Sequence, residues 1–159
     1  MTKIKIEKEF ISHSESETNL IGQSLGKNIK SGIVVLLYGD LGTGKTVFVK
    51  GVGEAMKISA VRSPSFTLIN EYESPTGIFL IHSDLYRLEE NQVYSLGLDE
   101  YIWADDSVLF VEWPERWKNF SAHNVIKIFF KALNENEREI KISAEGEKAQ
   151  EVINECFSC

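Results

Sequence analysis

Apolar residues follow two different periodicities along the chain, and their order predicts strands that alternate with helices. Continuous apolar runs span residues 33–38 and 78–81, and residues 107–111 form a third such segment that begins with Ser107. Short runs of this kind are typical of strands that are buried on both faces, as in a parallel sheet. Near the start of the chain, Ile4, Ile6 and Phe10 instead alternate with charged residues, which indicates a half-exposed strand.

Helical spacing predicts elements between these strands. Ser14 and Glu17 have the spacing of a capping box, which marks a helix start. An apolar stripe follows it, made of Leu20, Ile21, Leu25 and Ile29. Further helices are expected over about residues 45–56, 89–103 and 147–157.

The last third of the chain has a different pattern. Residues 124–133 and 138–144 alternate in polarity and are separated by the polar segment 134–137, which predicts a β-hairpin. Residues 63–72 begin as a loop and become an alternating strand. The whole pattern predicts an α/β fold, with a mostly parallel central sheet, flanking helices and an antiparallel C-terminal hairpin, in a single domain over residues 1–159.

The segment between the first buried strand and the following helix fits the phosphate-binding pattern GxxxxGK[ST] without a mismatch. It consists of Gly39, Asp40, Leu41, Gly42, Thr43, Gly44, Lys45 and Thr46. Glycines let the backbone curl so that N–H groups and a helix N-terminus face a polyphosphate. Lys45 is then expected to reach the β- and γ-phosphates, and the Thr46 hydroxyl to bind Mg²⁺. The motif predicts a P-loop NTPase-like fold that binds ATP and Mg²⁺.

Two acidic residues directly follow buried strands. Asp84 ends the segment IFLIHSD, and Glu112 ends SVLFVE. Strand ends on one side of a parallel sheet converge, so both carboxylates are expected beside the phosphate loop. Such a site needs a carboxylate for Mg²⁺ or for the attacking water. Asp84, Glu112 and Lys45 are therefore the candidate catalytic residues.

Composition restricts the partners and the compartment. The chain has 24 acidic and 17 basic residues, a net charge of −7, and its basic residues are scattered, which argues against tight nucleic-acid binding by this chain alone. No apolar run is long enough to span a membrane, and the first ten residues lack the apolar core of a signal peptide. Cys156 and Cys159, the only cysteines, are expected to be free thiols on a frayed tail, which favours a cytoplasmic protein.

Three kinds of P-loop protein can be compared on sequence. A GTPase requires NKxD and DxxG patterns, and neither occurs. A small-molecule kinase usually has an arginine-rich lid, but Arg62, Arg87, Arg116 and Arg138 are dispersed. An ATPase that works as a switch or a subunit fits best. A metabolite or nucleoside phosphotransferase, or a nucleotide-binding adaptor without turnover, stays open as an alternative.

Four segments together resemble one family. GDLGTGKT, SPSFTL, HSDLYRL and VEWPER, in this order and spacing, are similar to the TsaE (YjeE-like) family, the bacterial ATPase subunit of the machinery that forms threonylcarbamoyladenosine in tRNA. The resemblance implies that Glu112 is the magnesium-side glutamate and that Asp84 assists hydrolysis. It also implies that Trp113 lies beside the nucleotide and that Arg138 contacts it, with a looser contact near Ser14 or Glu15.

The resemblance also implies partners, and the loop-to-strand segment is a separate candidate for a switch. Members of the family dock on the transferase subunits TsaB and TsaD, which carry out the threonylcarbamoyl transfer next to the anticodon. Ser65 replaces the threonine common in the family's SPT[FY]TL segment and keeps its hydroxyl. Ser65 and Thr67 are candidates for sensing the γ-phosphate. Because no arginine finger is evident, slow hydrolysis is expected without partners.

Overall fold

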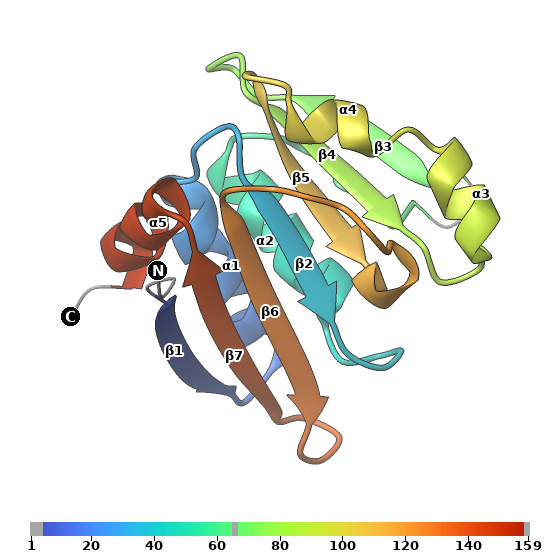
Figure 1. Ribbon diagram of the computed structural model, residues 1–159. Coiled ribbons are helices and arrows are strands. Elements are labelled where there is room, and N and C mark those ends of the chain that lie inside the picture. Colours follow the sequence, from blue (N-terminus) through green and yellow to red (C-terminus); the bar gives the residue numbers. More distant parts are fainter. Residues whose placement is uncertain (1–4, 65–66, 158–159) are drawn as a thin grey trace.

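A seven-stranded sheet forms the centre of the protein, with the strand order β1-β7-β6-β2-β5-β4-β3 (Figure 1). The computed structural model describes residues 5–64 and 67–157. Its strands are β1 (Lys5–Ser12), β2 (Val34–Tyr38), β3 (Ile69–Glu73), β4 (Phe79–Asp84), β5 (Ser107–Glu112), β6 (Val125–Ala132) and β7 (Arg138–Glu145).

The middle of the sheet is parallel and its edges are antiparallel. Strand β2 pairs in parallel with both β5 and β6, and β4 pairs in parallel with β5. The predicted hairpin is present as β6 and β7, β1 extends it, and β3 pairs with β4 in antiparallel fashion. The predicted fold class is thereby confirmed.

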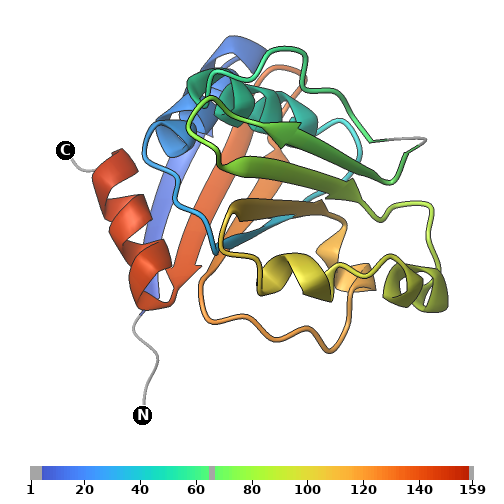
Figure 2. The same ribbon diagram turned by 90° about the horizontal axis from the view of Figure 1, so that it is seen from above.

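Helices cover both faces of the sheet (Figure 2). One face carries α1 (Glu15–Lys27), α2 (Lys45–Ala55) and α5 (Glu147–Phe157). The opposite face carries α3 (Glu90–Ser95), α4 (Asp99–Ile102) and the short 3₁₀ helix η1 (Pro114–Arg116). Alternate residues of β2 pack into two separate cores: Val35 and Leu37 face the first helix group, and Val34 and Leu36 face the second. This double burial explains the unbroken apolar runs in the sequence.

Some local expectations need correction. The helix expected over 89–103 is two short helices, because Gly97 between them has a φ of +71°. Leu20 was placed in the apolar stripe of α1 but is 57% exposed, and small residues take its place on the buried face. Ser14 caps α1 as expected, whereas the Glu17 carboxylate accepts from the backbone N–H of His13 rather than Ser14.

The C-terminal cysteines were expected on a frayed tail, and for Cys156 this is wrong. Cys156 lies in α5, half-buried, with its Sγ 3.4 Å from the carbonyl oxygen of Leu25. Burial raises the pKa of its thiol to about 11. Cys159 lies outside the described residues. Over the part of the chain that the structure describes, no helix is both long and apolar enough to cross a bilayer.

Helices α1 and α2 pack backbone to backbone through glycines. A Cβ atom added at Gly51 would lie 2.1 Å from the carbonyl oxygen of Asn19, and one added at Gly22 would lie 2.2 Å from that of Phe48. These carbonyl oxygens belong to the helix backbone, so they cannot move unless the whole helix moves. The close contact fixes α2, and therefore the phosphate loop at its start, against α1.

Overpacking usually costs about 1–3 kcal/mol, and a Cβ atom 2.1 Å from a backbone oxygen puts Gly51→Ala at the upper end of that range. Alanine also gains about 1 kcal/mol of helix propensity, so the expected net destabilisation is about 2 kcal/mol. The measurement is urea unfolding, with Lys50→Ala as the control because Lys50 is the exposed neighbour on the same helix. A Gly51→Ala protein as stable as the wild type would show that the helices are not in this close contact.

Candidate nucleotide-binding site

The predicted phosphate loop connects β2 to α2 as expected. Gly42 and Gly44 have φ values of +76° and +101°, which residues with a Cβ rarely adopt. Gly44 is the N-cap residue of α2, and no side chain caps this helix. The loop is closed internally by the Thr43 hydroxyl, which donates to the carbonyl of Asp40 at 2.7 Å. The backbone N–H groups at the start of α2 thus border the cleft described below.

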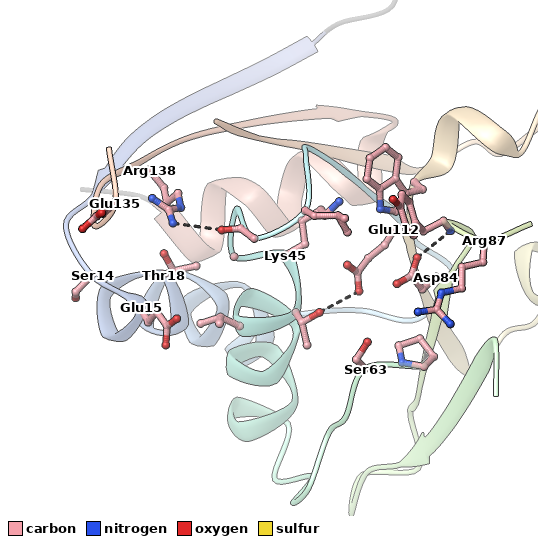
Figure 3. Close-up of a pocket in the computed structure, with 18 of the residues that line it drawn as sticks. Ser14, Glu15, Thr18, Lys45, Ser63, Asp84, Arg87, Glu112, Glu135 and Arg138 are labelled. Atoms are coloured by element: carbon pink, nitrogen blue, oxygen red, sulfur yellow. Dashed lines mark hydrogen bonds between the residues drawn. The ribbon is translucent and has the colours of Figure 1, made fainter. Parts of the chain in front are cut away.

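Lys45 and Thr46, in the first turn of α2, both line this cleft, and Figure 3 labels Lys45 there. The Lys45 ammonium donates to the carbonyl of Gly39, and its Nζ lies 4.3 Å from the ring centroid of Trp113. The Thr46 hydroxyl donates to Oε2 of Glu112 at 3.4 Å. The lysine and the threonine of the motif therefore both contact other residues of the predicted site.

The two predicted carboxylates end adjacent parallel strands. Asp84 and Glu112 are register partners in the β4–β5 pair, and both line the cleft. Glu112 is only 4% exposed, and its Oε2 lies 2.6 Å from Nε2 of His82. Asp84 accepts a hydrogen bond from the backbone N–H of Tyr86 at 3.0 Å. The structure thus brings both acids to the phosphate loop, as the sequence predicts.

Burial changes the proton affinity of two of these groups. Desolvation raises the pKa of Asp84, and the nearby Glu112 charge adds to this rise. Desolvation lowers the pKa of Lys45, although Glu112 and Asp84 act in the opposite direction. Displaced pKa values with specific charged neighbours are a common feature of functional sites.

The cleft has a volume of about 590 Å³ and extends from Asp84 past the phosphate loop to the β6–β7 turn. Trp113 lines it in a left-handed backbone conformation, with φ at +57°, and its ring lies 4.9 Å from that of Tyr86. Arg138 lines the far end and donates to the carbonyl of Gly42 at 3.2 Å (Figure 3). Leu41, at the tip of the loop, is 63% exposed.

Several lining residues were not assigned from the sequence, or only loosely. Ser14 and Glu15 at the start of α1 do line the cleft, and so do Glu135 and Asn136 of the hairpin turn. A hairpin turn carries no pattern that predicts a ligand site. Its part in the cleft follows from the pairing of β6 with β2, which brings the turn beside the loop (Figure 1).

The proposed switch segment is described only in part. Ser65 lies outside the described residues. Thr67 donates to Oδ1 of Asn70 at 2.5 Å, whereas Ser63 and Pro64 line the cleft. Arg87 also lines the cleft and forms no ion pair with any residue in 5–64 or 67–157.

The donor atoms here suit magnesium. Mg²⁺ prefers oxygen ligands and is usually held by one or two protein groups together with phosphates and waters. The Thr46 hydroxyl at the start of α2 and the Glu112 carboxylate at the end of β5, 3.4 Å apart, provide two such groups. Within the described residues, no group of three or more His, Cys, Asp or Glu side chains is arranged to hold a metal ion by itself.

The fold and the glycine-rich loop define a P-loop NTPase-like protein. The family model for "Threonylcarbamoyl adenosine biosynthesis protein TsaE" matches residues 12–140. The TsaE protein of Aquifex aeolicus is 41% identical over 85% of this chain and 95% of its own length. That of Bacillus subtilis is 38% identical over 87% of each chain. The crystal structure of Bacillus subtilis YdiB superimposes with a TM-score of 0.82 and 31% identity, covering 98% of this chain and 97% of that one.

This chain therefore belongs to the TsaE family. The resemblance carried by the four sequence segments is confirmed.

Proposed function

We propose that this protein binds ATP with Mg²⁺, hydrolyses it slowly, and serves as the ATPase subunit in the formation of threonylcarbamoyladenosine in cytoplasmic tRNA. One observation carries the proposal: the glycine loop, Thr46, Asp84 and Glu112 surround one cleft. Membership of the TsaE family supports the biosynthetic role, because the relatives in Aquifex aeolicus and Bacillus subtilis have names that state it.

In this proposal each residue has a distinct task. The loop from Gly39 to Thr46 and the Lys45 ammonium hold the triphosphate, so Lys45 must exchange the Gly39 carbonyl for phosphate oxygens. Asp84 orients the attacking water. Mg²⁺ held by Thr46 and Glu112 would neutralise charge that develops on the β- and γ-phosphates. Arg138 and Trp113 contact the nucleotide from the two sides of the loop.

The partners are proposed to be TsaB- and TsaD-type subunits. A P-loop site catalyses mainly by positioning and charge stabilisation, so a missing positive group keeps it slow. Docking of a partner over the cleft would supply that group. The transfer to tRNA itself is assigned to the partner, in agreement with the net charge of −7 on this chain.

A steady-state ATPase assay with and without the two partner subunits tests the proposal. We expect slow ADP release by the protein alone and clear stimulation by the partners. Stimulation by a small acceptor that becomes phosphorylated would instead identify a phosphotransferase. Tight ATP binding without phosphate release, even in the full complex, would identify an adaptor without turnover.

Tryptophan fluorescence gives an independent measure of nucleotide binding. The Lys45 ammonium lies 4.3 Å from the Trp113 ring centroid, and phosphate binding must draw it away, so the emission of Trp113 is expected to change on addition of MgATP. The Trp113→Phe variant should lose this change, while buried Trp117 and exposed Trp103 keep their background emission. If the variant keeps the full change, Trp113 is not beside the nucleotide.

A further inference from the structure

His82 is a buried histidine that the proposed mechanism does not yet use. It lies in β4, two residues before Asp84, and is 0% exposed. Its Nε2 lies 2.6 Å from Oε2 of Glu112 on the neighbouring strand. An ionised carboxylate only accepts hydrogen bonds, so Nε2 carries the hydrogen and donates it. The contact links β4 to the end of β5, where Glu112 lines the cleft.

The other ring nitrogen of His82 is left without a partner. Nδ1 is buried and has no hydrogen bond to any residue in 5–64 or 67–157. Burying an unsatisfied polar atom lowers the stability of the folded protein. Leu80 on the same strand and Phe110, the register partner of His82, are both apolar and fully buried. An apolar residue would thus suit position 82 better for packing alone, so the histidine calls for a functional reason.

The contact determines how the Glu112 carboxylate is oriented. Oε2 accepts from both His82 and the Thr46 hydroxyl, at 2.6 and 3.4 Å. Oε1 has no hydrogen bond to the described residues. Because Glu112 is 4% exposed, water contributes little to holding its carboxylate, and the imidazole is its closest donor.

We infer that His82 is a positioning residue that acts through Glu112. It holds Oε2 so that Oε1 is left available to the nucleotide-bound Mg²⁺ or to a water bound to it. The inference rests on the proposed function, since it assigns a role within the same site. Outer groups of this kind typically change metal affinity or activity by about 10–100-fold when they are removed.

Two amide variants test whether the position of the donor N–H at residue 82 matters, or only the polarity of the side chain. Glutamine places an N–H near the Nε2 position of histidine, whereas asparagine places it near Nδ1. Mn²⁺ affinity is measured in the presence of a non-hydrolysable ATP analogue, from the electron paramagnetic resonance signal of free Mn²⁺. The affinity of His82→Gln is expected to lie within about threefold of the wild-type value. His82→Asn is expected to lose about 10–100-fold in Mn²⁺ affinity and in kcat. Affinity for ADP without metal should be unchanged in both.

A double-mutant cycle tests whether His82 acts through Glu112. In a Glu112→Gln background, His82→Asn should have no further effect on Mn²⁺ affinity, because residues that act as one unit are not additive. His82→Leu, which fills the same space, replaces the asparagine variant if that protein does not fold. His123→Leu is the matched control, because His123 is exposed and outside the cleft.

The outcomes distinguish the inference from the proposed function. A wild-type protein that binds neither nucleotide nor Mn²⁺ with nucleotide overturns the proposed function. The inference alone is overturned if the wild type binds nucleotide and Mn²⁺ but His82→Asn and His82→Gln have equal Mn²⁺ affinity. Additive losses in the double-mutant cycle would also overturn it, because they would make His82 a structural residue independent of Glu112.

Discussion

Replacing Lys45 with alanine is expected to lower ATP affinity by at least about 100-fold. A hydrogen bond to a charged group contributes about 1.5–3 kcal/mol, and Lys45 is assigned two phosphates. Each ~1.4 kcal/mol corresponds to a tenfold change in affinity, so the loss of both contacts exceeds two powers of ten. Isothermal titration with ATP and Mg²⁺ measures the effect directly.

The control for Lys45→Ala has to remove the same charge elsewhere on the helix. Lys50→Ala does so, because Lys50 is exposed on α2 outside the cleft, and it should bind ATP as the wild type does. Lys45 also contacts the Gly39 carbonyl and the Trp113 ring, so a thermal melt must show that the variant is folded. ATP affinity within threefold of the wild type would exclude Lys45 from phosphate binding.

Asp84→Asn is expected to reduce kcat by about 10²–10⁴-fold, the usual contribution of a positioned acid–base group, and Glu112→Gln by about 10²–10³-fold, the usual cost of losing one group that stabilises transition-state charge. Each change keeps the shape of the side chain and removes its charge. ATP affinity should fall much less than kcat, because the glycine loop and Lys45 hold the triphosphate. Single-turnover hydrolysis and ATP titration on the same preparations separate the two effects.

Glu115→Gln is the matched control for the two carboxylates. Glu115 is exposed three residues beyond Glu112, outside the residues that line the cleft, and its replacement should change kcat little. If Glu112→Gln and Asp84→Asn both hydrolyse ATP at the wild-type rate, the assignment of catalytic carboxylates is wrong. If only one variant hydrolyses ATP at the wild-type rate, the carboxylate replaced in the other variant carries the catalytic role alone.

Much of the fold could be predicted because its strands have unambiguous patterns. The run at residues 33–38 contains β2, which is buried on both faces, and short continuous runs of this kind are typical of strands in a parallel sheet. The β6–β7 hairpin and α5 were predicted from alternation and spacing, and both are present. Prediction was weakest over 89–103, where Gly97 ends one short helix before the next begins. Apolar spacing alone does not show such a break.

The phosphate loop and the two carboxylates could be predicted because each has a local signal. The loop has fixed spacing, and Asp84 and Glu112 each end an apolar run. The contact between His82 and Glu112 has no such signal, because it depends on the register of β4 against β5. The same holds for Glu135 and Asn136, which reach the cleft only through the pairing of distant strands.

A crystal structure with a non-hydrolysable ATP analogue and Mg²⁺ tests the central claim most directly. The account predicts the β- and γ-phosphates inside the loop from Gly39 to Thr46, with the Lys45 ammonium moved from the Gly39 carbonyl to phosphate oxygens. It also predicts Mg²⁺ beside Thr46 and Glu112. Phosphates bound elsewhere in the molecule, or a loop whose N–H groups do not contact them, would contradict it.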